Sequence, residues 1–176
     1  MPAMVKLNLF FILVFLSVVA NAQTDRKPAI SLGPELNVPQ RSGYTIGYGA
    51  SANFELPVAA SVNLMVAAGY HRYNHKNFGF NNYIKPGPDY FTPLKAGVKY
   101  YPDAKLYLAG ELGTVFNNKN NSGSTSNLFA YSLGTGFLLP VNSEKTNHVD
   151  IGLRFENWSQ NRLRQFAIRV AYRFHL

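Results

Sequence analysis

Apolar and polar side chains alternate along most of the chain beyond residue 28, with no helical stripe of useful length. Successive side chains of a β-strand point to opposite faces, so a period of two is typical of strands with one apolar face. We expect strands in the eight segments that show this period: residues 30–38, 44–56, 62–70, 94–100, 106–116, 129–139, 149–155 and 166–176. The sequence therefore predicts an all-β protein.

The links between these segments alternate in length. Asn, Ser, Gly and Pro dominate them, and these residues favour turns. Short links occupy residues 57–61, 102–104 and 140–147, long ones occupy 73–90, 117–127 and 157–165, and only the short link 39–43 departs from the alternation. Short turns on one side and long loops on the other are typical of antiparallel up-and-down barrels in membranes. A tilted strand of about 10 residues spans roughly 25 Å, which matches the apolar band of such barrels.

The N-terminus predicts a secretory signal peptide. Lys6 precedes an apolar run over residues 7–19, and Ala20-Asn21-Ala22 supplies the small residues of a cleavage site. The run is short for a transmembrane helix, which needs about 20 apolar residues. We therefore expect a cleaved segment over residues 1–22 and a single barrel domain over residues 23–176. Since the chain has no cysteine, a disulfide scaffold, a cysteine-based zinc site and lipoprotein anchoring are all excluded.

The charge of the chain is strongly positive, with 17 Lys and Arg against 9 Asp and Glu. Such an excess suits nucleic-acid binding, but an exported protein does not meet chromosomal DNA, so we expect no nucleic-acid partner. Ten of the charges fall on the polar parity of the strands, five of each sign: Glu35, Glu55, Lys95, Lys99, Glu111, Asp150, Arg154, Glu156, Arg169 and Arg173. We predict that they form an ion-pair network that fills the lumen.

Neighbouring strands suggest particular partners within this network. Arg154 and Glu156 would face Arg169 and Arg173 on the next strand. Lys95 and Lys99 would face Glu111, and Glu35 would meet the last strand where the barrel closes. These pairings follow from adjacency in the sheet alone.

Aromatic residues on the apolar parity gather near the strand ends. They are Tyr44, Tyr70, Phe116, Phe129, Phe155 and Phe166 at the loop end, and Phe54, Tyr100, Phe137, Tyr172 and Phe174 at the turn end. Two aromatic girdles indicate two membrane interfaces. They favour a transmembrane barrel over the alternative, a soluble lipocalin-like barrel with an apolar interior. Basic residues dominate the loop end, and we expect them to contact an anionic outer leaflet: Arg41, Arg72, Lys76, Lys85, Lys119, Arg162 and Arg164.

Residues 166–176 end the chain with a strongly alternating strand, in which Phe166, Ile168, Val170, Tyr172, Phe174 and Leu176 share one face. This ending, the eight strands and the signal peptide together resemble the small OmpA/OmpX-like outer-membrane β-barrels of Gram-negative bacteria. The resemblance implies a monomer with both termini in the periplasm, and contacts with outer-membrane lipids and lipopolysaccharide. It also implies that these six residues are the signal read by the barrel-assembly machinery.

The resemblance leaves the function open, because this fold serves several roles. One alternative is a lipid A-modifying enzyme, and another is a surface adhesin or ligand-binding barrel that works through its loops. The segment 70–75 holds His71 and His75 but no serine nucleophile. Their spacing on an extended chain is about 13 Å, too long for one metal ion. His148 and His175, near the turn end, suggest nothing catalytic, so we expect no enzyme activity, metal or cofactor.

Overall fold

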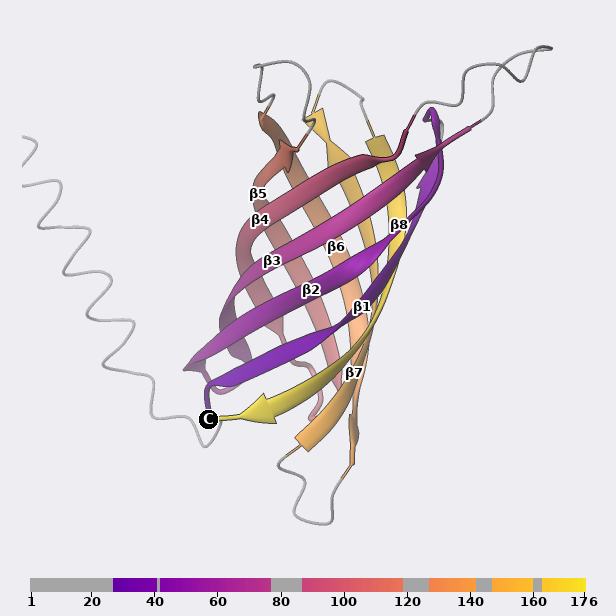
Figure 1. Ribbon diagram of the computed structural model, residues 1–176. Coiled ribbons are helices and arrows are strands. Elements are labelled where there is room, and N and C mark those ends of the chain that lie inside the picture. The colour runs from indigo at the N-terminus through magenta and orange to yellow at the C-terminus, as the bar shows by residue number, and fades with distance from the viewer. Residues whose placement is uncertain (1–26, 41, 77–86, 119–126, 142–146, 160–162) are drawn as a thin grey trace, which may run out of the picture.

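The chain folds into a closed barrel of eight antiparallel strands, in which each strand pairs with its neighbours in sequence and β8 returns to β1 (Figure 1). The computed structural model describes residues 27–40, 42–76, 87–118, 127–141, 147–159 and 163–176. The predicted signal peptide lies outside these residues. The strands are β1 (Ala29–Gln40), β2 (Tyr44–Ala59), β3 (Val62–His75), β4 (Asp89–Tyr100), β5 (Leu106–Asn117), β6 (Asn127–Pro140), β7 (Asn147–Trp158) and β8 (Leu163–His175). The predicted all-β, up-and-down architecture is confirmed.

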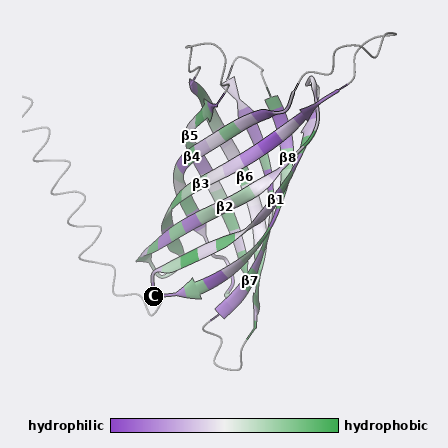
Figure 2. Ribbon diagram, viewed as in Figure 1, coloured by the Kyte–Doolittle hydropathy of each residue, from purple (hydrophilic) through white to green (hydrophobic). Residues whose placement is uncertain are grey.

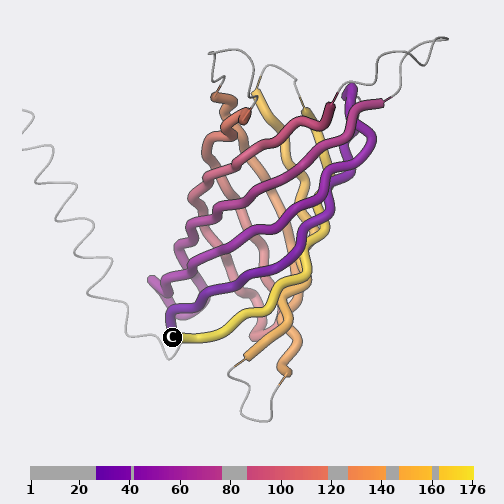
Figure 3. Tube along the Cα trace, viewed as in Figure 1, coloured from indigo at the N-terminus to yellow at the C-terminus, as the bar shows by residue number. Residues whose placement is uncertain are grey.

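Closure joins the first and last strands over nearly their full length. Ile30 lies opposite Phe174, and Val38 lies opposite Phe166. The strands are tilted steeply, and the links β2–β3 and β4–β5 lie at the same end as the C-terminus, as do the end of β6 and the start of β7 (Figure 3). We call this the turn end and the opposite end the loop end. At the turn end the Leu176 amide donates a hydrogen bond to the Pro28 carbonyl over 2.8 Å, so both ends of the described barrel meet there.

The two faces of the barrel wall differ as the alternation predicted. Apolar side chains cover the outside along every strand, and Leu133, Leu112 and Leu32 are each more than half exposed. Figure 2 shows the apolar and polar residues alternating along the ribbons. Charged and polar side chains such as Glu55 and Asp150 are buried inside. Among the described residues, no helix is long and apolar enough to cross a membrane.

One predicted outward residue points the other way. Tyr44 was expected on the apolar outer face, but its ring packs inside against Tyr73 and Phe91, with centroids 5.5 and 6.1 Å away. The register of β2 against β3 shifts between Tyr44 and Gly47, which marks a β-bulge or irregularity. An extra residue at a bulge reverses the alternation of side chains, and this places Tyr44 in the barrel mouth.

Glycines inside the strands make room for aromatic side chains in the lumen. A Cβ atom on Gly47 would collide with the Tyr73 ring, and one on Gly49 with His71. At the turn end, Gly136 and Gly152 leave space for the Tyr107 phenol in the same way. Gly47, Gly49 and Gly136 thus relieve crowding by large side chains that lie across the strand.

We expect Gly47→Val to destabilise the barrel by about 1–3 kcal/mol, because the added atoms overlap the fully buried Tyr73 ring. Ala50→Val, on the exposed face of the same strand, is the matched control and should change the stability little. Equilibrium urea unfolding in lipid vesicles measures both. Equal stabilities of the two variants would contradict this account of Gly47.

Candidate functional site: the barrel lumen and its outer rim

The lumen holds two clusters of ion pairs stacked along the barrel axis. The loop-side cluster consists of Glu35, Lys95, Glu111, Arg154 and Glu156. The turn-side cluster consists of Glu55, Lys99, Asp150, Arg169 and Arg173. All ten of these residues are the predicted lumen charges, and each contacts at least one residue of opposite sign.

Lys95 and Arg154 hold the loop-side cluster together. The Lys95 ammonium lies 2.6 Å from Glu111 Oε2 and 2.5 Å from Glu156 Oε2. Arg154 Nη2 lies 2.6 Å from Glu35 Oε1, and Arg154 Nε lies 3.1 Å from Glu156 Oε2. Because three carboxylates share two cations, this cluster carries a formal charge of −1.

Glu55 is the centre of the turn-side cluster. Its Oε1 accepts a hydrogen bond from Lys99 Nζ over 2.7 Å, and its Oε2 accepts one from Arg173 Nη2 over 3.0 Å. The Tyr101 phenol donates a further hydrogen bond to Oε2 over 2.6 Å. The carboxylate is 1% exposed, so these donors replace water entirely.

Asp150 is the second anion of the turn-side cluster and lies on the opposite wall. Lys99 Nζ and Arg169 Nη1 each approach its Oδ2 to 3.3 Å, while the Tyr107 phenol donates to Oδ1 over 2.7 Å. Lys99 Nζ also lies 4.0 Å from the centre of the Tyr107 ring. With two carboxylates and three cations, this cluster carries a formal charge of +1, which balances the loop-side cluster.

Ser51 joins the two clusters. Its hydroxyl donates to Glu35 Oε2 over 2.9 Å and accepts a hydrogen bond from Arg169 Nε over 2.9 Å. A cavity of about 30 Å³ remains beside the turn-side cluster, lined in part by Lys99, Tyr107 and Arg169. That volume holds one or two water molecules.

One partner predicted by strand adjacency is confirmed, because Lys95 pairs with Glu111, but the other partners differ. Glu156 pairs with Lys95 and Arg154 rather than with Arg169 or Arg173. Lys99 pairs with Glu55 and Asp150 rather than with Glu111. Glu35 does lie opposite Arg169 of β8 in register, as predicted, but its ion pair is with Arg154 of β7. The reason is the narrow bore, because long side chains reach across an eight-stranded lumen as easily as along its wall.

Two apolar layers, which the alternation did not reveal, lie beyond the ion clusters. The loop-side cap is a cluster of buried residues around Trp158: Tyr73, Phe91, Val115, Leu128, Ala130, Trp158 and Leu163. Tyr101, Tyr107 and Leu138 form a smaller cluster at the turn end. The loop-side cap was missed because strands β3, β7 and β8 extend into segments that the sequence assigned to loops, where Tyr73, Trp158 and Leu163 lie.

The histidines near the loop end occupy two different environments. His71 is buried inside, and its Nε2 lies 3.6 Å from Glu35 Oε1. His75 lies at the mouth, where its Nε2 is 3.3 Å from Asp89 Oδ2, and the Tyr44 phenol donates to that same oxygen over 2.6 Å. In the described part of the chain, no three His, Asp or Glu side chains are grouped as metal ligands.

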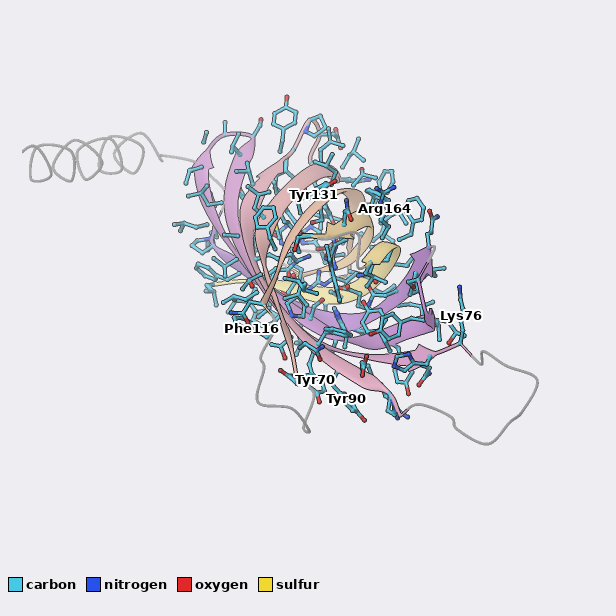
Figure 4. All side chains as sticks on the ribbon, turned by 90° about the horizontal axis from the view of Figure 1, so that it is seen from above. Tyr70, Lys76, Tyr90, Phe116, Tyr131 and Arg164 are labelled. Atoms are coloured by element: carbon cyan, nitrogen blue, oxygen red, sulfur yellow. The ribbon has the colours of Figure 1, made fainter. Side chains whose placement is uncertain are left out.

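The outer rim of the loop end combines aromatic and basic side chains. Tyr70 and Tyr90 stack on the outside with centroids 5.7 Å apart, and Figure 4 shows them side by side. Arg72 lies between Tyr48 and Tyr90 in register, with its guanidinium carbon 5.9 Å from the centre of the Tyr48 ring.

The other predicted rim cations are only partly described. Lys76 directly follows β3, and Arg164 is exposed near the start of β8. Arg41, Lys85, Lys119 and Arg162 lie outside the described residues. The contact of all seven with lipopolysaccharide stays a prediction.

The proposed assembly signal forms the outer face of β8. Phe166, Ile168, Val170, Tyr172 and Phe174 are exposed there, and Leu176 follows the strand. The face is continuous and apolar. Its recognition by the assembly machinery stays a prediction.

The fold matches solved structures of outer-membrane barrels. The outer membrane protein Ail of Yersinia pestis in a phospholipid nanodisc gives a TM-score of 0.60 at 12% identity, over 85% of this chain and 99% of that chain. Ail in complex with the heparin analogue sucrose octasulfate gives 0.54 at 16% identity, over 84% and 98%. OprG of Pseudomonas aeruginosa gives 0.54 at 14% identity, over 85% and 97%.

No protein-family model matches the chain, and no curated protein matches it either. At the identities above, the likeness shows the fold alone. It confirms the predicted resemblance at that level: the chain has the eight-stranded architecture of small outer-membrane barrels.

We expect Glu55→Gln to lower the free energy of unfolding by about 3–5 kcal/mol, because it leaves Lys99 and Arg173 buried without their shared carboxylate. Asp103→Asn, which removes an exposed carboxylate at the same end, is the control and should change it by less than about 0.5 kcal/mol. Urea unfolding in lipid vesicles gives both values. If Glu55→Gln behaved like the control, the turn-side cluster would not stabilise the barrel.

Proposed function

We propose that the chain is an integral outer-membrane protein with a closed lumen and a basic outer rim that contacts lipopolysaccharide. Both termini lie in the periplasm, the protein is a monomer, and it has no catalytic site or cofactor. The observation that carries the proposal is the distribution of side chains across the barrel wall. Apolar residues cover the outside, while ten charged residues are enclosed.

A soluble barrel is disfavoured by this distribution. Leu133 is 68% exposed and Leu112 60%, and similar side chains continue around the whole wall. Soluble monomers rarely expose contiguous apolar patches larger than a few hundred Å². A lipocalin-like barrel would place its apolar face inside, which is the reverse of what the chain does. The hydrocarbon of a bilayer is the environment that suits the outer surface.

The layers inside the barrel support a closed lumen. The loop-side cap, the two ion clusters and the tyrosines at the turn end succeed one another along the axis. Eight strands enclose a space that side chains just fill. An ion crossing this space would have to separate buried ion pairs, and we therefore propose that the barrel does not act as a diffusion pore.

The rim supports contact with an anionic lipid surface. Arg72 extends its guanidinium between outward-facing tyrosines, at the height where the apolar wall ends. A guanidinium binds phosphate oxygens through two parallel hydrogen bonds, and tyrosine rings favour a membrane interface. Lys76 and Arg164 add positive charge at the same end. Phosphates of lipopolysaccharide match this combination.

A second candidate function is the binding of sulfated polysaccharides by the same rim, as in an adhesin. It is favoured by the fold likeness to Ail, which was solved with a heparin analogue. Sulfate and phosphate present similar oxygens to arginine. A lipid A-modifying enzyme finds less support. His75 does have an acidic neighbour in Asp89, but that carboxylate also accepts a hydrogen bond from Tyr44, and in the described chain no serine contacts His75.

Purified protein in planar lipid bilayers should show no large, steady conductance, because the ion clusters, the loop-side cap and the turn-end tyrosines occupy the lumen. Single-channel recording measures this directly. A variant such as Glu55→Gln, which loosens the turn-side cluster, serves as the comparison and should raise the frequency of brief openings. Large steady currents through the unaltered protein would refute the closed lumen.

A triple variant that neutralises the described rim cations should retain less lipid A when the barrel is purified. Its substitutions are Arg72→Gln, Lys76→Gln and Arg164→Gln. The matched control is Lys27→Gln with Lys105→Gln, which removes exposed charge at the turn end. Mass spectrometry quantifies the retained lipid A, and retention equal to the control would overturn the rim assignment. Heparin binding is measured in parallel. Loss of heparin binding with unchanged lipid A would favour the adhesin.

A further inference from the structure

Two histidines that lie 27 residues apart in sequence meet at the turn end of the barrel. His148 follows the first residue of β7, and His175 is the last residue of β8, the neighbouring strand. Their ring centroids are 5.5 Å apart, and the ring planes cross at 77°. Both side chains are only partly buried, so solvent reaches the pair. The ion clusters and the rim proposed above do not involve these residues.

The separation of the rings fits two imidazoles bound to one metal ion. A metal–nitrogen bond of about 2.1 Å places the ion about 3.2 Å from each ring centre. Two such rings at a tetrahedral angle have centres about 5.2 Å apart. The observed distance of 5.5 Å between the ring centroids is close to this value, and it requires only a small opening of the nitrogen–metal–nitrogen angle.

Two further features concern the nitrogen atoms and the local charge. His148 Nδ1 is buried and has no hydrogen-bond partner among the described atoms. Arg173, which lies opposite His148 in register, is the nearest cation on β8, and a positive charge opposes metal binding. Its guanidinium, however, is held by Glu55 over 3.0 Å, which offsets that charge.

From these observations we propose that His148 and His175 bind a transition-metal ion of the kind that imidazole prefers, namely Cu²⁺, Ni²⁺ or Zn²⁺. Two protein ligands leave the remaining coordination positions to water, so the site is open and its metal exchanges with the solution. A bound ion would also link β7 to β8 at the turn end. Among these ions Cu²⁺ binds such a site most tightly.

The test uses the mature protein without a polyhistidine tag, folded in detergent micelles and titrated with CuCl₂. Electron paramagnetic resonance counts the nitrogen ligands from their hyperfine splitting, and the wild type should show two. His148→Gln and His175→Gln should each weaken Cu²⁺ binding by at least about tenfold. The double variant should lose the two-nitrogen spectrum.

His75→Gln is the matched control, since it removes a partly exposed imidazole at the opposite end of the barrel and should leave the Cu²⁺ spectrum unchanged. The heat-dependent shift of each variant on SDS gels verifies that it is folded. The proposal is overturned if the double variant keeps the wild-type spectrum, if His75→Gln abolishes it, or if the wild type shows no two-nitrogen signal. The result is independent of the lipopolysaccharide rim, because none of the rim residues is altered.

Discussion

Closure of the sheet between β1 and β8 is the constraint on which the rest of the structure depends. A lipid bilayer offers no hydrogen-bond partner to an open strand edge, so every backbone group within it must be paired by the protein. Ten register pairs from Ala29 to Gln40 join these two strands and leave no edge. Eight strands closed in this way enclose a bore that side chains fill, and the size of the interior follows directly from the strand number.

The narrow bore explains why the charges of the lumen form cross-barrel clusters. Arg154 reaches from β7 to Glu35 on β1, and Lys95 reaches from β4 to Glu156 on β7. Each such pair connects strands that are not neighbours in the sheet, and so links separate parts of the wall across the lumen. The opposite formal charges of the two clusters, −1 and +1, cancel along the axis, with Ser51 between them. The two clusters together are thus neutral although they contain ten formal charges.

Alternation and link lengths were sufficient to predict the strands, the faces and the residues of the ion clusters. They predicted the pair of Lys95 with Glu111 on adjacent strands, but not the pairs across the lumen, because a pattern along one chain carries no information about which side chains meet there. Tyr44 was misplaced because a bulge breaks the period locally, and the loop-side cap was missed where Tyr73, Phe91 and Trp158 lie near strand ends. The meeting of His148 and His175 required the register of β7 against β8, which the sequence alone leaves open.

The pairing of β1 with β8 also has a consequence for the order of events during biogenesis. Arg169 of β8 donates a hydrogen bond to Ser31 of β1, a contact between residues 138 positions apart. During synthesis β1 is made long before the strand that completes its edge, and neither the complete ion clusters nor the loop-side cap can form until β7 and β8 have been made. The apolar outer wall and the buried ion clusters must therefore form together, late in folding and cooperatively. Until then, factors outside the chain must keep its apolar side chains from aggregating and its strand edges from pairing with other chains.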